Sequence, residues 1–244
     1  MVSKQDPFGS FSAQDYLQEY YGTLGEENLF LLSFLHRTYE LWKPAVLCDI
    51  GSGPTIYQLI SPSRHSPEIH ILEYLQPNRK EIEAWVNDRS GFSWEAYFQN
   101  VAQREGLGAE GSAQIQARLR KSIRSISEVN LFVPINPSLI PARIDTISSH
   151  FCVESITEDP QQFEVAWDNL INVVPDSGKL VMSLLKNART YRAGDKYFPA
   201  YPVDEQFLQQ ELENRGFQDI VMETIPAEDE RDYEGIICVR AIRS

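Results

Sequence analysis

The segment from residue 47 to residue 57 (LCDIGSGPTIY) constrains the fold of this chain more than any other. The mainly apolar run 46–50 is typical of a parallel strand covered on both faces, and Pro54 is typical of the first turn of a helix. Gly51 and Gly53 lack a Cβ, so the backbone between them can turn sharply and touch a ligand. The amides at the predicted helix start are expected to form an anion site. This order predicts the opening unit of a nucleotide-type α/β domain, and therefore an enzyme.

An acidic residue ends the second predicted strand. Glu73 follows the apolar run 69–72 about 20 residues after the glycine turn, where a carboxylate can accept hydrogen bonds from ribose hydroxyls. The glycines do not form a GxGxxG pattern, which disfavours a dinucleotide with a pyrophosphate. S-adenosylmethionine has a ribose and a carboxylate but no phosphate, so it suits Glu73 and the glycine turn. The plain alternative is a tight turn followed by an exposed glutamate.

Strands and helices alternate along the 244 residues, which predicts one α/β domain with a mostly parallel, Rossmann-like sheet. Predicted parallel strands cover residues 46–50, 69–73, 123–129, 144–151 and 179–185, and an antiparallel pair covers 217–224 and 235–241. Predicted helices cover residues 11–39, 54–60, 77–88, 160–173 and 203–215. Residues 89–120 are too long for a simple connection and predict a helix followed by a polar, mobile tail.

Charge and cysteine usage favour a small-molecule enzyme. A net charge of −13 without a basic patch disfavours nucleic acid. It is compatible with a cationic substrate, although solubility alone explains it as well. Cys48, Cys152 and Cys238 are widely spaced and form no metal-binding motif. Because it has neither a signal sequence nor a long apolar span, the sequence predicts a cytoplasmic protein that does not bind membranes. It contains no heptad pattern, so we expect a monomer or a weak oligomer.

Four segments resemble the nicotinamide, phenylethanolamine and indolethylamine N-methyltransferase family. They are DIGSGPTIYQL at residues 49–59, DYLQEYY at 15–21, FCVE at 151–154, and YRAG at 191–194 followed by Phe198 and Pro202. The resemblance implies a class I methyltransferase domain with one antiparallel strand near the C-terminus. Residues 1–44 would form cap helices, residues 89–122 an insertion, and residues 186–202 a substrate-side segment.

The same resemblance implies S-adenosylmethionine as cofactor and S-adenosylhomocysteine as product, and it assigns the binding residues. The implied cofactor residues are Tyr16, Tyr21, Gly51, Ser52, Gly53, Thr55, Tyr57, Glu73, Tyr74, Asn78, Asn130, Leu131, His150 and Phe151. The implied substrate residues are Tyr16, Glu154, Asn187, Tyr191 and Asp232. No metal is implied. Tyrosine faces attract both a sulfonium and an ammonium group, and Asn130, which replaces a family acid, can still accept a bond from the adenine amine.

Glu154 is the candidate catalytic residue, because an amine must lose a proton on the way to its methylated product. Asp232, just before the last predicted strand, is a second candidate acid for the amine, and a solvated loop acid is the alternative interpretation. Three positions differ from those of the nicotinamide and phenylethanolamine enzymes: Ser183 or Leu184, Asn187 and Ala200. We therefore expect the methyl acceptor to be another small amine, and we interpret the protein as an enzyme of specialised biosynthesis. Two alternatives stay open: an O- or C-methyltransferase that uses His150 as base, and a non-catalytic member that binds the cofactor.

Overall fold

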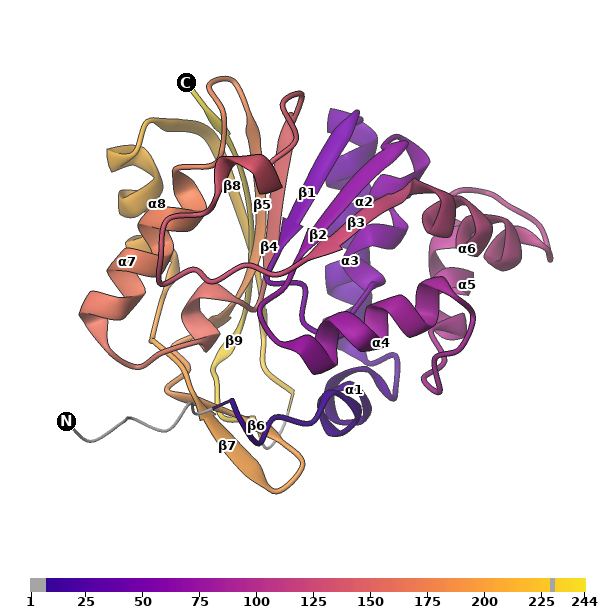
Figure 1. Cartoon of the computed structure of the whole chain (residues 1–244), viewed down its shortest axis with the longest axis horizontal. Coiled ribbons are helices and arrows are strands. Elements are labelled where there is room, and N and C mark those ends of the chain that lie inside the picture. The colour runs from indigo at the N-terminus through magenta and orange to yellow at the C-terminus, as the bar shows by residue number, and fades with distance from the viewer. Residues whose placement is uncertain (1–7, 229–230) are drawn as a thin grey trace.

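The computed structural model describes residues 8–228 and 231–244, which fold around a seven-stranded sheet (Figure 1). The strand order is β3-β2-β1-β4-β5-β9-β8. The strands are β1 (Val46–Ile50), β2 (Glu68–Leu72), β3 (Ile123–Ser127), β4 (Thr146–His150), β5 (Lys179–Lys186), β8 (Phe217–Pro226) and β9 (Gly235–Arg243). β1 to β5 are parallel, and β9 pairs antiparallel with both β5 and β8. The predicted sheet is therefore confirmed, including its single reversed strand.

The strand order reverses at the centre of the sheet. β1 pairs with β2 on one side and with β4 on the other, and all five residues of β1 are buried. The connections that follow β1 and β4 run in opposite directions, which opens a crevice at the carboxyl ends of these two strands. Both candidate turns, after Ile50 and after His150, lie at this crevice.

Helices cover both faces of the sheet (Figure 1). One core holds apolar residues of α2 (Glu26–Trp42), α3 (Tyr57–Ile60), α4 (Gln76–Val86), α5 (Glu95–Arg104) and α6 (Gly111–Ser122). The other holds those of α7 (Pro160–Ile171) and α8 (Glu205–Asn214). Within β1, Leu47 joins the first core, whereas Cys48 and Ile50 join the second. Short 3-10 turns cover Pro62–Arg64, Pro137–Leu139 and Val153–Ser155.

A cap crosses the carboxyl end of the sheet. It combines α1 (Ala13–Tyr21) with a hairpin formed by β6 (Thr190–Ala193) and β7 (Lys196–Pro199), which lie close together in Figure 1. The Arg192 amide donates to Tyr20 Oη at 3.2 Å, and the Arg192 guanidinium pairs with Glu19 at 2.8 Å. On the other side, Gln14 Nε2 donates to Glu81 Oε2 of α4 at 3.0 Å. α1 therefore bridges the hairpin and α4.

Three local features differ from the sequence prediction. The helix after the glycine turn begins at Tyr57 rather than at Pro54, because residues 51–56 form turns held by side-chain hydrogen bonds. The expected polar tail of the insertion is helix α6, which buries Ile115 and Leu119 against the core. The β6–β7 hairpin was not predicted. No helix in the described part of the chain is long and apolar enough to cross a bilayer.

Candidate functional site

A cavity of about 920 Å³ opens at the crevice and extends beneath the cap. Its walls come from the turn after β1, the end of β2, the loop after β3, the turn after β4, α1 and the first turn of α2. Segments far apart in sequence therefore meet here. Its size suits a ligand as large as a nucleoside derivative together with a small second molecule.

The glycine turn forms part of the floor of the cavity. Gly51 and Gly53 have φ values of +72° and +60°, which L-residues with a Cβ adopt only at a cost. A Cβ on Gly51 would lie 2.0 Å from Cys152 Sγ, whereas a Cβ on Gly53 would meet nothing within 4 Å. Gly51 thus allows the turn after β4 to pack closely, and Gly53 leaves its backbone open to the cavity.

The backbone amides of Gly51 and Gly53 already have hydrogen-bond acceptors within the protein. Gly51 N–H donates to Leu72 O at 2.7 Å, and Gly53 N–H donates to Glu73 Oε2 at 2.9 Å. These bonds join the turn after β1 directly to the end of β2. The glycine residues therefore contribute an open backbone surface, and the acid at the end of β2 is fixed to it.

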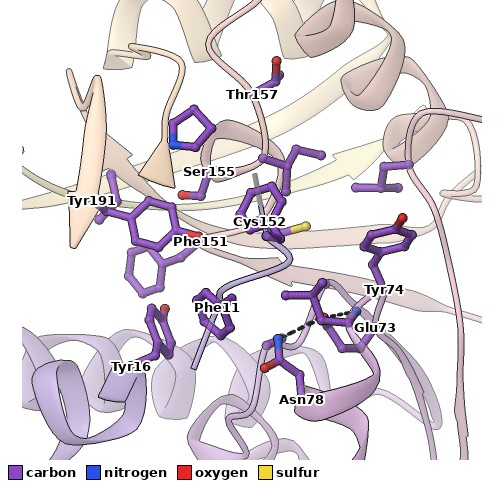
Figure 2. A pocket seen from close by; sticks show the side chains of 18 of the residues that line it. Phe11, Tyr16, Glu73, Tyr74, Asn78, Phe151, Cys152, Ser155, Thr157 and Tyr191 are labelled. Carbon is purple, nitrogen blue, oxygen red and sulfur yellow. Dashed lines mark hydrogen bonds between the residues drawn. The ribbon is translucent and has the colours of Figure 1, made fainter. Parts of the chain in front are cut away.

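Three hydrogen bonds hold the Glu73 carboxylate in the cavity wall. Its Oε1 accepts from Leu75 N–H at 2.8 Å and from Asn78 Nδ2 at 3.1 Å, in addition to the bond from Gly53 (Figure 2). Burial nevertheless raises the pKa of Glu73 above its usual value. Asn78 Oδ1 is buried without a hydrogen-bond partner among the described residues. A hydroxyl or amino group of a ligand could donate the missing hydrogen bond to this oxygen.

Ser52 and Thr55, which were expected to contact the cofactor, instead form hydrogen bonds that stabilise the glycine turn. Ser52 Oγ donates to buried Asp49, and Thr55 Oγ1 donates to Ser52 O at 2.8 Å and to Gln58 Oε1 at 3.0 Å. Gln58 Nε2 in turn donates to Asp49 Oδ2 at 2.9 Å. This buried network satisfies the polar groups that follow β1, so Ser52 and Thr55 stabilise the site from behind.

Tyrosine rings line the side of the cavity below the cap. Figure 2 shows Tyr16 and Tyr191 on the side of the pocket opposite Glu73 and Asn78. Tyr21 stacks on Tyr57 with ring centroids 5.1 Å apart, and the Tyr57 ring is buried behind it. Burial raises the pKa of Tyr16 well above its usual value, so its phenol stays protonated and can donate a hydrogen bond. The wall is therefore aromatic, with hydroxyl groups as its polar atoms.

The turn after β4 is strained. Phe151 has φ +50° although it carries a ring, and its N–H donates to Ser183 O at 2.7 Å. Such a conformation costs about 1–3 kcal/mol and persists where the surroundings fix it. It directs the chain so that Cys152 packs on Gly51 and Phe151 faces the cavity.

Glu154, the candidate catalytic residue, lies behind the wall rather than on it. Its side chain is fully buried between Ser155 and Leu185, both of which line the cavity. Oε1 accepts from Leu185 N–H at 3.0 Å and from Ser155 Oγ at 3.2 Å, whereas Oε2 has no partner among the described residues. Burial raises the pKa of Glu154 to about 7, which suits proton exchange near neutral pH.

His150 is also behind the wall. Its Nδ1 lies 3.0 Å from Ser183 Oγ, and burial lowers its pKa to about 4. A neutral, enclosed imidazole packed near the Tyr57 ring is a structural group. The geometry therefore gives no support to His150 as the base of an O- or C-methyltransferase.

The structure brings most, but not all, of the predicted site residues to the cavity. Those that line it are Tyr16, Tyr21, Gly51, Gly53, Glu73, Tyr74, Asn78, Asn130, Leu131, Phe151 and Tyr191. Those that do not are Ser52, Thr55, Tyr57, His150, Glu154, Asn187 and Asp232. Asn187 and Asp232 are exposed, and Asn187 Nδ2 donates to Glu234 at 2.8 Å. Asn130 Oδ1 already accepts from Phe132 N–H at 2.8 Å, so it is partly engaged in its own turn.

Several wall residues were missed by sequence reasoning. They are Phe8, Phe11, Tyr20, Glu27, Asn28 and Tyr233. Glu27 looks like an ordinary acid in a first helical turn, which the helix dipole favours, so the sequence gives no signal that it is buried in a wall. Tyr233, rather than its neighbour Asp232, points inward from the loop before β9.

The fold is that of class I S-adenosylmethionine-dependent methyltransferases. A structure of such a methyltransferase from Clostridium acetobutylicum matches with a TM-score of 0.56 and 9% identity over 95% of this chain and 97% of that one. The Burkholderia thailandensis 1,6-didemethyltoxoflavin-N1-methyltransferase, with bound substrate and S-adenosylhomocysteine, matches with a TM-score of 0.52 and 13% identity over 95% of this chain and 87% of that one. These similarities concern the fold.

The chain belongs to the NNMT/PNMT/TEMT family, whose sequence profile matches residues 1–243. Phenylethanolamine N-methyltransferase of Sus scrofa is 32% identical over 70% of this chain and 62% of that protein. Indolethylamine N-methyltransferase of Mus musculus is 25% identical over 89% of this chain and 86% of that protein. The chain thus spans 62% of the length of the Sus scrofa phenylethanolamine enzyme. The family expected from the four segments is confirmed.

Proposed function

We propose that the protein transfers a methyl group from S-adenosylmethionine to a nitrogen of a small amine. The observation that carries this proposal is the pair of Gly53 and Glu73, joined at 2.9 Å on the floor of a cavity with tyrosine walls. A carboxylate fixed at the end of β2 is suited to two ribose hydroxyls. S-adenosylmethionine, when bound, supplies a methyl group on a positively charged sulfur.

The residues present fit this cofactor. Asn78 Oδ1 is a buried acceptor without a partner in the described structure, beside a carboxylate that is already in place. Gly53 leaves a space that any Cβ would enter. Tyr74 and Leu131 frame the same side of the cavity and suit a flat base. The aromatic rings of Tyr16 and Tyr21 suit the sulfonium charge.

We assign the proton-accepting role to Glu154. Its raised pKa of about 7 lets the carboxylate take a proton near neutral pH, and its unpartnered Oε2 is the atom available for it. Because Ser155 and Leu185 separate it from the cavity, the transfer requires a rotation of the side chain or a bridging water. The protein groups otherwise align the two reactants and exclude water.

The proposal is tested by calorimetric titration with S-adenosylmethionine and S-adenosylhomocysteine, followed by a methyl-transfer screen over amines, phenols and N-heterocycles. We expect binding of both cofactor forms and methylation of an amine. Binding without turnover on any acceptor would favour a non-catalytic member of the family, and turnover on phenols alone would favour an O-methyltransferase. Absence of binding would refute the proposal.

A further inference from the structure

Glu27 is a further acidic residue of the cavity wall, in addition to Glu73, Glu158 and Asp159. Glu27 lies in the first turn of α2 and lines the wall together with Tyr233, which lies two residues before β9. In the sheet, β9 is three positions away from β1, which corresponds to about 14 Å at the usual strand spacing. The contact with Tyr233 therefore places the Glu27 carboxylate on the β9 side of the cavity.

The Glu27 carboxylate is held by hydrogen bonds and forms no direct ion pair with another described residue. Its Oε2 accepts from Tyr233 Oη at 2.9 Å, and its Oε1 accepts from Glu228 N–H at 3.1 Å. Glu27 is only 6% exposed, and no basic group of the described residues lies within ion-pair distance of its carboxylate. Arg231, on the same loop, pairs with Glu19 and Glu228, and the nearby charge of Glu27 also raises the pKa of the arginine. A buried carboxylate accepts about four hydrogen bonds, so Glu27 retains capacity for a cationic partner.

The next residue in the chain, Asn28, provides a further acceptor at the cavity. Asn28 is 8% exposed and lines the cavity, and its Nδ2 donates to Tyr20 O at 2.9 Å and to Thr23 O at 3.2 Å. Its Oδ1 receives no hydrogen bond from the described residues. Tyr20 Oη accepts from Arg192 N–H at 3.2 Å. This side of the cavity thus presents unsatisfied acceptors, while the neighbouring Leu31 is apolar.

We propose that Glu27, supported by Tyr233 and Asn28, binds a protonated amino group of the methyl acceptor that is distinct from the nitrogen being methylated. A buried carboxylate favours the protonated form of an amine, whereas the reacting nitrogen must be unprotonated. The position of Glu27 on the β9 side of the cavity also separates the two groups. The substrate class is a diamine on an apolar or aromatic scaffold. This inference rests on the proposed function, because it needs an amine to be methylated at the other end.

The experiment compares matched amines on the intact protein saturated with S-adenosylhomocysteine. The pairs are hexamethylenediamine with hexylamine and para-xylylenediamine with benzylamine, measured by calorimetry and by initial rates of methylation with S-adenosylmethionine. We expect each diamine to bind about tenfold or more tightly than its monoamine. Glu27→Gln should abolish that preference. Glu26→Gln, which removes the same charge from the exposed neighbour, should retain it.

Tyr233→Phe provides a second variant that keeps the carboxylate but removes one of its supports, and it should reduce the preference partially. If the diamine preference is absent while monoamines are methylated, the inference is wrong and the proposed function stands. If Glu27→Gln weakens monoamines and diamines equally, Glu27 binds the reacting nitrogen and the inference is again wrong. If S-adenosylhomocysteine does not bind the unaltered protein, the proposed function itself fails.

Discussion

Replacing Glu154 by Gln should change how the stability of the protein depends on pH. The carboxyl group is fully buried, and burial raises its pKa from 4.5 to about 7. The folded state therefore holds this proton more tightly than the unfolded state, and stability falls as the pH rises from about 4.5 through 7. At 1.36 kcal/mol per pH unit, the loss amounts to about 3 kcal/mol.

The Gln side chain has nearly the same shape and stays neutral, so this loss disappears. Its amide oxygen can keep the bond from Leu185 N–H, but its NH2 group replaces Oε2 and finds no acceptor there among the described residues. The protonated carboxyl of the unaltered protein places an O–H donor at the same position, so the two proteins should differ little in stability at pH 4. By pH 8 the variant should be more stable than the unaltered protein by about 3 kcal/mol.

Urea titrations between pH 4 and pH 8.5, followed by circular dichroism, measure this difference. Other titrating groups, Glu73 among them, are present in both proteins and cancel in the comparison. Glu164→Gln, the same substitution on the exposed face of α7, serves as the matched control. A constant difference between Glu154→Gln and the unaltered protein would refute the reasoning, because the buried carboxyl would then have an ordinary pKa.

Further predictions concern the site directly. Glu154→Gln should leave S-adenosylhomocysteine affinity intact by calorimetry and lower the methylation rate at saturating amine; an unchanged rate would remove the proton-accepting role. Glu73→Gln places an amide NH2 near a backbone donor and removes one acceptor for the ribose, so S-adenosylhomocysteine should bind about tenfold to a hundredfold more weakly. Gly51→Ala should lower the free energy of unfolding by more than about 2 kcal/mol, because the positive φ and contact with Cys152 both oppose it. Gly53→Ala should cost about 1–2 kcal/mol from φ alone, and equal losses in urea titrations would contradict the difference in packing.

The sheet and its crevice were predictable because they rest on local patterns. The apolar run before Gly51 and the apolar residues before Glu73 have the period and length of buried parallel strands, and the order of elements then places their carboxyl ends together. The hydrogen bond from Gly53 to Glu73 follows from the pairing of β1 with β2. These residues lie where the sequence predicts them.

The parts that were not predictable depend on tertiary packing. Nothing local distinguishes Tyr233 from Asp232 as the inward residue of a loop, since only the contact with Glu27 decides between them. The β6–β7 hairpin pairs short segments that carry no alternating pattern long enough to be read. Glu154 was expected to face the pocket, but the bond from Leu185 N–H holds its carboxylate behind the wall.

The bridge formed by α1 has a kinetic consequence. We expect that separation of contacts such as Gln14 with Glu81 and Glu19 with Arg192 would widen the exit for a ligand seated beneath α1. These contacts are polar and partly exposed, so each contributes little to stability and is weakened by salt. Residence times of bound molecules should therefore shorten as ionic strength rises, even where the affinity-determining contacts deep in the cavity are untouched.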